Sequence, residues 1–235
     1  MTGRDYAGRL LSNQEFCTYL YHEAAPYEVA LNDLISTFST DFEPRGLEVA
    51  APPEVDLEEL STPPYILAFF DLLIQLGGHR SVLEIGTFVG HSAMQFARMV
   101  GPTGHVTTIE TSAVFADMAE ANFRRNGLDD RITLLRGSAS KVLDTLTGQQ
   151  FDFVFVDGGK EDYLEYTIKS LDLLSEHGII VVDDAFFHGD ALNKDPSTEK
   201  GQGCKDLLTF FGTEKKHKKT IMPVGNGILV ITQTR

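Results

Sequence analysis

The chain has few of the residues on which several classes of protein depend. Its 235 residues include two cysteines, Cys17 and Cys204, too few for a disulfide framework or a cysteine metal site. It contains no apolar run near the ~20 residues that span a bilayer, and Met1 to Asp5 do not resemble the start of a signal peptide. Basic residues are also scarce, with 20 Lys and Arg against 34 Asp and Glu. Because an acidic surface repels phosphate backbones, we expect a cytoplasmic globular protein with neither a nucleic-acid nor a membrane partner.

Strand-like and helix-like segments alternate from residue 81 onward. Several of the strand-like runs are continuously apolar, which is typical of strands buried on both faces of a parallel sheet. The alternation predicts right-handed βαβ units and a doubly wound α/β fold. The strand-like runs cover residues 81–85, 105–109, 131–135, 152–156 and 178–182.

Two of the intervening segments carry helix signals. One extends from Thr111-Ser112 to Asn126-Gly127, with polar capping residues in front and a glycine stop behind. The other has Tyr163, Ile168, Leu171 and Leu174 on one stripe. We expect this second helix to end at His177-Gly178, where glycine can adopt the left-handed conformation.

The two ends of the chain depart from this alternation. Residues 5–40 have helical periodicity and no strand signal, and Pro44, Pro52 and Pro53 then mark an irregular acidic connection. We therefore divide the chain into an N-terminal helical extension, 1–55, and a main domain, 56–235. Near the C-terminus, two apolar runs flank Gly225-Asn226-Gly227, which predicts an antiparallel hairpin at one edge of the sheet.

A glycine-containing turn follows the first strand and opens a helix. Its spacing is Gly86-x-x-x-Gly90 and lacks the G-x-G-x-x-G fingerprint of dinucleotide-binding proteins. Glu110 ends the second strand, where a carboxylate can accept hydrogen bonds from both hydroxyls of a ribose. The turn after the third strand, 137–139, is small enough to flank an adenine ring.

Acidic residues end the next two strands. Asp157 follows the fourth strand, with Lys160 three residues later, and Asp183 and Asp184 follow the fifth. Neighbouring parallel strands bring their carboxyl ends together, so these three carboxylates should converge. A hard divalent cation with oxygen ligands would relieve their repulsion.

The segment Glu84-Ile85-Gly86-x-x-x-Gly90-His91-Ser92 resembles the first motif of class I methyltransferases that use S-adenosylmethionine. From about Leu60 onward the chain resembles the metal-dependent O-methyltransferases of the catechol and caffeoyl-CoA type, and residues 222–228 fit that family's closing hairpin. The resemblance implies a Rossmann-like, mostly parallel seven-stranded sheet, an S-adenosylmethionine site, a divalent cation such as Mg²⁺ and a homodimer.

The resemblance also implies roles for individual residues. Asp157, Asp183 and Asp184 match the metal ligands, with Asp184 in place of a usual amide, and Lys160 matches the catalytic lysine. Gly158-Gly159 replaces a pair that usually bears side chains. The residues implied at the cofactor are Thr62, Glu84 (at the amino group of the methionine part), Gly86, Thr87, Phe88, Ser92, Glu110, Ser138, Ala139 and Asp157.

These parts predict methyl transfer to a small acceptor with two vicinal oxygens, such as a catechol. The metal would act as Lewis acid and template, and Lys160, with its pKa lowered by a neighbouring cation and sulfonium, would remove the hydroxyl proton. Three alternatives remain: an α-hydroxyacyl acceptor on a carrier protein, a non-catalytic S-adenosylmethionine-binding protein, and a nicotinamide-dependent oxidoreductase. We interpret His91, His177 and His188 as surface or pocket residues, and the basic run 215–219 as a solvated turn.

Overall fold

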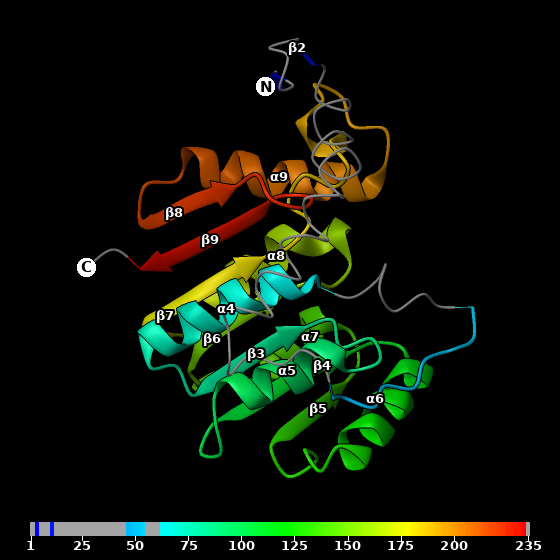
Figure 1. Ribbon diagram of the computed structural model, residues 1–235. Helices are drawn as coiled ribbons and strands as arrows, with labels where there is room; N and C mark the ends of the chain where they lie inside the picture. The colour runs from blue at the N-terminus through cyan, green and yellow to red at the C-terminus, as the bar shows by residue number, and fades with distance from the viewer. Residues whose placement is uncertain (1–2, 5–9, 12–45, 55–61, 234–235) are drawn as a thin grey trace.

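The computed structural model describes residues 3–4, 10–11, 46–54 and 62–233 of the chain. Its centre is a seven-stranded sheet in the order β5-β4-β3-β6-β7-β9-β8 (Figure 1). The first five strands along the chain, β3 to β7, are parallel; β9 is antiparallel to β7, and β8 is antiparallel to β9. The bounds are β3 Ser81–Ile85, β4 His105–Glu110, β5 Ile132–Arg136, β6 Phe151–Val156, β7 Leu174–Val182, β8 His217–Met222 and β9 Ile228–Gln233.

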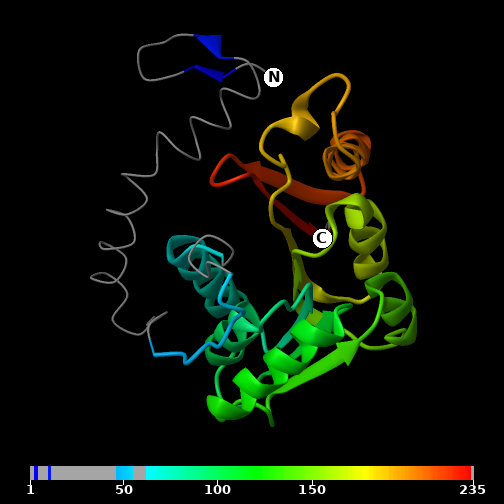
Figure 2. The same cartoon turned by 90° about the vertical axis from the view of Figure 1, so that its right-hand side faces the viewer.

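Helices cover both faces of this sheet (Figures 1 and 2). One core cluster packs α4, α5 and α6 against one face, and a second packs α7, α8 and α9 against the other. The predicted doubly wound fold and its C-terminal hairpin are therefore confirmed. The helix bounds are α4 Pro64–Gly77, α5 His91–Met99, α6 Ala113–Arg125, α7 Ala139–Thr145, α8 Tyr163–Leu171 and α9 Glu199–Thr213, with short 3-10 turns η2 Lys160–Asp162 and η3 Asp190–Leu192.

The helix α6 begins and ends where its sequence signals predict. Ser112 is the N-cap, and its Oγ accepts a hydrogen bond of 3.4 Å from the N–H of Phe115. At the other end Gly127 has φ +62°, a left-handed conformation that glycine adopts without strain. The short connections on either side of α6 position the ends of β4 and β5 next to each other.

The predicted helix that begins at Tyr163 is wrong in its C-terminal part. The helix α8 ends at Leu171, and Leu174 instead begins β7, where it pairs with Phe151 of β6. Gly178 lies inside β7, where an added Cβ would be 2.9 Å from the carbonyl oxygen of Phe151. This glycine permits close approach of two strands at a register shift and does not end a helix. Ile168 is 39% exposed and so departs from the predicted buried stripe, whereas Tyr163 is fully buried.

Two smaller expectations are also corrected. The N-terminal segment was expected to contain no strand, but Leu10–Leu11 pairs with Gly3–Arg4 as a two-residue antiparallel ladder. The rest of the predicted helical extension over 5–40 lies outside the described residues. In the basic run 215–219, the last three residues begin the edge strand β8 and are not part of a turn. Lysines on an edge strand discourage pairing with another chain.

Residues 46–54 form an irregular connection, as the prolines predict. Leu47 and Val49 pack against the core on the α4–α6 face. The side chain of Asn122 accepts from the N–H of Ala50 and donates to its carbonyl oxygen, at 2.9 and 3.0 Å. The division of the chain at residue 55 stays a prediction. Across the described residues, no helix combines the length and apolar character needed to cross a membrane.

Candidate functional site

A cavity of about 440 Å³ opens at the carboxyl ends of β3, β4, β5 and β6. Doubly wound sheets bind ligands at this edge, where the loops after the strands diverge. Nine of the ten residues predicted at the cofactor line the cavity, and the exception is Glu84. The nine are Thr62, Gly86, Thr87, Phe88, Ser92, Glu110, Ser138, Ala139 and Asp157.

The turn after β3 depends on two glycines with positive φ. Gly86 has φ +103°, and an added Cβ would be 2.4 Å from the carbonyl oxygen of Asp157. Gly90 has φ +86°, and its added Cβ would meet the Phe123 ring at 2.4 Å. Phe88 between them also has a positive φ, +51°, which is strained for an aromatic residue. The backbone at this turn therefore passes directly beside the cavity and the end of β6.

The Glu110 carboxylate is held by backbone groups on both sides. Its Oε2 accepts from the N–H of Phe88, and its Oε1 accepts from the N–H of Ser112, each at 2.8 Å. The ring of Phe88 packs edge-on against Phe115, with centroids 4.7 Å apart. The carboxylate is thus fixed at the cavity wall, with lone pairs left for the hydroxyls of a ribose.

Glu84 lies beneath the cavity and is fully buried. Its Oε2 accepts a hydrogen bond of 2.5 Å from Thr108 Oγ1, which in turn lies 2.5 Å from Thr87 Oγ1. Its Oε1 has no partner among the described residues. Burial raises the pKa of Glu84 to about 8, although Ser92 and Thr108 donate hydrogen bonds to it. The predicted contact with the cofactor's amino group stays a prediction.

The three predicted metal-ligand candidates end the adjacent strands β6 and β7. Val156 pairs with Val182, so Asp157 and Asp183 leave the sheet side by side. Asp184 has φ +54°, and its N–H donates to Asp183 Oδ1 at 2.8 Å. The expected convergence of carboxylates at this edge is therefore present in the fold.

Lys160 lies between two of these carboxylates. Its Nζ is 2.7 Å from Asp157 Oδ1 and 3.1 Å from Asp184 Oδ2, and it lies 5.0 Å from the centroid of the Tyr163 ring. Burial disfavours the charged ammonium, but Asp157, Tyr163 and Asp184 outweigh that effect and raise the pKa of Lys160 well above its usual value. The described residues alone therefore hold the proton on Lys160, and the expected lowering of its pKa by a neighbouring cation and sulfonium stays a prediction.

The donor atoms of this cluster fit a hard divalent cation by type and charge. Three carboxylates face one ammonium, and burial together with the charges of Asp157 and Asp184 raises the pKa of Asp183 to about 8. Within the described ranges, however, no three His, Cys, Asp or Glu side chains are arranged so that they could hold a metal ion. The Lys160 ammonium pairs with Asp157 and Asp184, and Asp183 has no ion pair with it among the described residues.

The helix α9 packs directly against the turn that carries Lys160. An added Cβ on Gly203 would be 2.4 Å from the carbonyl oxygen of Lys160, and Cys204 Sγ donates to the carbonyl oxygen of Asp184 at 3.7 Å. Sequence reasoning missed both positions. A glycine in the middle of a helix, where it costs stability, is the signal that would have found Gly203.

Sequence reasoning also missed part of the cavity wall. The wall includes His91, the first residue of α5, whereas His177 and His188 are exposed. Phe88 also lines the cavity, whereas Phe186 is buried in the core. Gly137, in the loop expected beside an adenine ring, lines the cavity as well, and the other missed lining residues are Ile85, Ile109, Thr111, Gly158, Gly159, Glu161, Asp162 and Tyr166.

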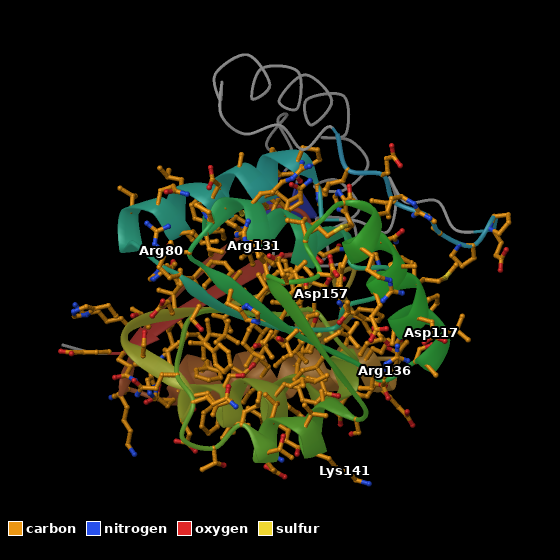
Figure 3. The ribbon with its side chains drawn as sticks, turned by 90° about the horizontal axis from the view of Figure 1, so that it is seen from below. Arg80, Asp117, Arg131, Arg136, Lys141 and Asp157 are labelled. Atoms are coloured by element: carbon orange, nitrogen blue, oxygen red, sulfur yellow. The ribbon has the colours of Figure 1, made fainter. Side chains whose placement is uncertain are left out.

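Figure 3 labels Asp157 near the middle of the view and shows Arg136 and Asp117 next to each other on one side. Arg136 ends β5 and pairs with Asp117 at 2.7 Å and with Glu120 at 3.0 Å, both on α6. These ion pairs join β5 to α6 beside the loop 137–139 of the cavity. Arg80 and Arg131 lie together at the opposite end of the strands (Figure 3) and donate to carbonyl oxygens at the end of α5.

Comparisons with known proteins agree on one family. The model of the O-methyltransferase family matches residues 49–234. A protein named "Probable caffeoyl-CoA O-methyltransferase 1" from Dictyostelium discoideum is 31% identical over 171 residues, which are 71% of this chain and 74% of that protein. Catechol O-methyltransferase from Mycobacterium tuberculosis is 35% identical over 159 residues, covering 68% and 72% of the two chains.

A solved structure shares the whole architecture. The O-methyltransferase TomG from Streptomyces achromogenes, involved in tomaymycin synthesis and solved in complex with S-adenosylmethionine, superposes with a TM-score of 0.73. It is 27% identical in sequence, and the match covers 88% of this chain and 99% of that one. The likeness therefore extends over the sheet, its helices and the cavity edge.

Proposed function

We propose that this chain, which belongs to the O-methyltransferase family, moves a methyl group from S-adenosylmethionine to a hydroxyl of a small acceptor with vicinal oxygens. We also propose that the transfer needs a divalent cation. The observation that carries the proposal is the position of Lys160, between Asp157 and Asp184 and next in the chain to Gly159 and Glu161, which line the cavity. A side chain that could act as a base once it has lost its proton thus lies close to the cavity proposed for the methyl donor.

The cavity wall supports S-adenosylmethionine as the ligand. Glu110 is fixed by two backbone N–H groups and offers its remaining lone pairs to ribose hydroxyls. The small-residue loop 137–139 at the end of β5 provides space for the adenine, and Thr62 and Ser92 line the cavity near the turn after β3, where the methionine part would lie. The relative TomG was solved with this cofactor.

Asp157, Asp183 and Asp184 are the residues that would hold the cation. All three offer oxygen donors, which hard divalent ions prefer. A bound cation supplies a Lewis acid that lowers the pKa of an acceptor hydroxyl and neutralises the excess carboxylate charge. The cation and the Lys160 ammonium would compete for Asp157 and Asp184, so occupancy of the site and the charge on Lys160 are linked.

The transfer itself needs few groups. To act as the base, Lys160 must first lose its ammonium proton, which a cation bound by Asp157 and Asp184 would favour by taking these partners from it. The neutral Nζ would then take the proton of the acceptor hydroxyl. The oxygen then attacks the sulfonium methyl in line; an O–C bond forms, the S–C bond breaks, and its electron pair stays on sulfur. Most of the rate enhancement comes from holding the two reactants in this geometry.

A methyl-transfer assay with and without chelator tests the proposal. Labelled methyl should pass from S-adenosylmethionine to at least one member of a panel of catechols and α-hydroxyacyl thioesters, stop with chelator and return with Mg²⁺. Binding of the metal should also raise the free energy of unfolding of the protein, by ~2.7 kcal/mol when the free metal concentration is a hundred times its dissociation constant. Full activity of protein shown by elemental analysis to be metal-free would contradict metal dependence and leave the cofactor assignment standing.

Variants of the acidic cluster separate its roles. Asp157→Ala and Asp183→Ala should abolish turnover, whereas Asp184→Asn should be milder because an amide oxygen can still coordinate. Lys160→Ala should lower kcat more than it raises KM, the pattern of a group that acts mainly in the transition state. Equal losses of kcat in the Lys160→Ala variant and in an exposed-lysine control, Lys218→Ala, would exclude Lys160 as the base.

We also expect a homodimer, which rests on the family resemblance alone. Light scattering should then give twice the 26.0 kDa mass of the chain. A monomeric species at working concentration would contradict it.

A further inference from the structure

One wall of the cavity has no role in the proposed function so far. This wall consists of the loop after Asp157 and the first part of α8. It carries two carboxylates and a tyrosine, and Glu110 lines the same cavity. Its residues are Gly158, Gly159, Glu161, Asp162 and Tyr166.

This wall faces the start of α7. Lys169 of α8 donates from Nζ to the carbonyl oxygen of Ser140 at 2.7 Å and pairs with Asp144 at 2.7 Å, so α7 and α8 lie side by side. Tyr166 lies one helical turn before Lys169, and Ala139 begins α7; both line the cavity. The wall and the loop 137–139 therefore enclose the same end of the cavity.

That end is where the purine base would lie. The strand β4, which ends in Glu110, lies between β5 and β3 in the sheet. The turn after β3 lies on one side of Glu110, and the loop 137–139 after β5 lies on the other. A cofactor with its ribose on Glu110 and its methionine part at the turn after β3 directs its adenine toward Ala139 and Tyr166.

The Tyr166 ring forms the surface behind the glycine pair. An added Cβ on Gly158 would be 3.4 Å from Tyr166 Cε2, an ordinary contact distance, and Gly159 has φ −61°. A Cβ would therefore make only ordinary contacts at both positions, and both glycines, Asp162 and Tyr166 line the cavity.

Tyr166 fixes the carboxylate of Asp162. Its hydroxyl donates to Asp162 Oδ2 at 3.1 Å, and its ring is 6% exposed. Burial, together with Asp162, raises the pKa of Tyr166, so the phenol keeps the proton that it donates. Among the described residues, Asp162 Oδ1 has no hydrogen-bond donor, so it is available to a donor on a ligand.

We infer that Asp162, held by Tyr166, accepts a hydrogen bond from the exocyclic amino group of the cofactor's adenine and makes the cavity select adenine over a 6-oxopurine. An ionised carboxylate accepts hydrogen bonds only, so it attracts an amino group and repels a carbonyl at the same ring position. The inference rests on the proposed cofactor and adds the residue pair that reads its base.

The test compares two ligands that differ in the group at purine position 6 and in the hydrogen that a 6-oxopurine carries at N1. Calorimetry on the full chain measures the dissociation constants of S-adenosylhomocysteine and its 6-oxo analogue, S-inosylhomocysteine. The wild type should bind the adenine compound at least about tenfold more tightly, as expected for a hydrogen bond to a charged acceptor. Asp162→Ala should bring the ratio toward one by weakening the adenine compound, and Asp162→Asn should strengthen the 6-oxo compound because an amide can donate.

Two further variants distinguish hydrogen bonding from general charge effects. Tyr166→Phe should lower the ratio without changing the charge, because Asp162 then loses its fixed orientation. Glu165→Gln removes a negative charge from the same helix at an exposed position that pairs with Lys169, and it should leave the ratio unchanged. An unchanged ratio in Asp162→Ala, or an equal fall in Glu165→Gln, would overturn the inference. No binding of S-adenosylhomocysteine by the wild type would instead refute the proposed cofactor.

Discussion

The backbone N–H of Phe88 donates to the carboxylate of Glu110 at 2.8 Å, joining the turn after β3 to the end of β4. Phe88 has a positive φ, and this hydrogen bond helps to hold the strained turn in place. The same carboxylate lines the cavity. One side chain therefore shapes the turn and faces the cavity.

Glu110→Ala should weaken the binding of S-adenosylhomocysteine, since hydrogen bonds to a charged group contribute ~1.5–3 kcal/mol. Glu110→Gln should lose less, because its amide oxygen still accepts one of the backbone N–H groups. Calorimetry measures both, with Glu176→Gln as control, since Glu176 is exposed and lies toward the other end of the β7 strand. Unchanged affinity in a folded Glu110→Ala protein would remove Glu110 from the site.

The positions of the parallel strands along the chain were predictable because each strand has its own local signal. The runs 81–85 and 152–156 differ from the observed strands by at most one residue at an end, and Gly225-Asn226-Gly227 marks the hairpin. The role of Gly178 could not be predicted from the neighbouring sequence. Its role is set by the carbonyl oxygen of Phe151, which lies on another strand and leaves no trace near Gly178 in the sequence.

The site was predictable wherever a residue directly follows a strand. Gly86, Glu110 and Asp157 lie at strand ends, and parallel pairing alone brings them to one edge. The state of Lys160 was not predictable, because its two partners, Asp157 and Asp184, lie on different strands. Asp162 and Tyr166 were missed for a similar reason, since only the packing of α8 against α7 brings them to the cavity.

The glycines of α9 provide a matched pair of substitutions. Gly203→Ala would place a Cβ 2.4 Å from the carbonyl oxygen of Lys160, whereas at Gly212 an added Cβ has no atom within 4 Å. Gly212→Ala should stabilise the protein by ~0.5–1 kcal/mol through helix propensity. Gly203→Ala should destabilise it by ~1–3 kcal/mol, as overpacking does, and lower kcat by displacing Lys160. Denaturant unfolding and steady-state kinetics measure these effects, and equal behaviour of the two variants would contradict the close packing.

Asp190 should make the loop before α9 sensitive to acid. Partial burial raises its pKa, but the N–H and hydroxyl groups of Ser197 and Thr198 donate to its carboxylate and lower the pKa to about 2. Because the folded pKa lies below the unfolded value of ~3.9, the stabilisation is complete above pH ~4 and is lost as the pH falls toward 2. Asp190→Asn should therefore be less stable than the wild type at pH 6, and the difference should shrink by pH 2.5 in thermal unfolding. A difference that stays constant over this range would show that these hydrogen bonds do not depend on the charge.

The buried carboxyl of Glu84 should give the opposite pH dependence. Burial raises its pKa to about 8, well above the unfolded value of ~4.3. Between these two values the folded protein holds a proton that the unfolded chain releases, so this group's contribution to stability falls as the pH rises from about 4 to 8. Glu84→Gln removes the titration and keeps a neutral group that can still accept from Thr108. The difference in free energy of unfolding, variant minus wild type, should therefore increase from pH 5 to pH 8. Denaturant titrations of both proteins measure this difference. Glu176→Gln, at an exposed site, should show no such trend, and a flat difference for Glu84→Gln would mean that Glu84 is ionised in the folded protein.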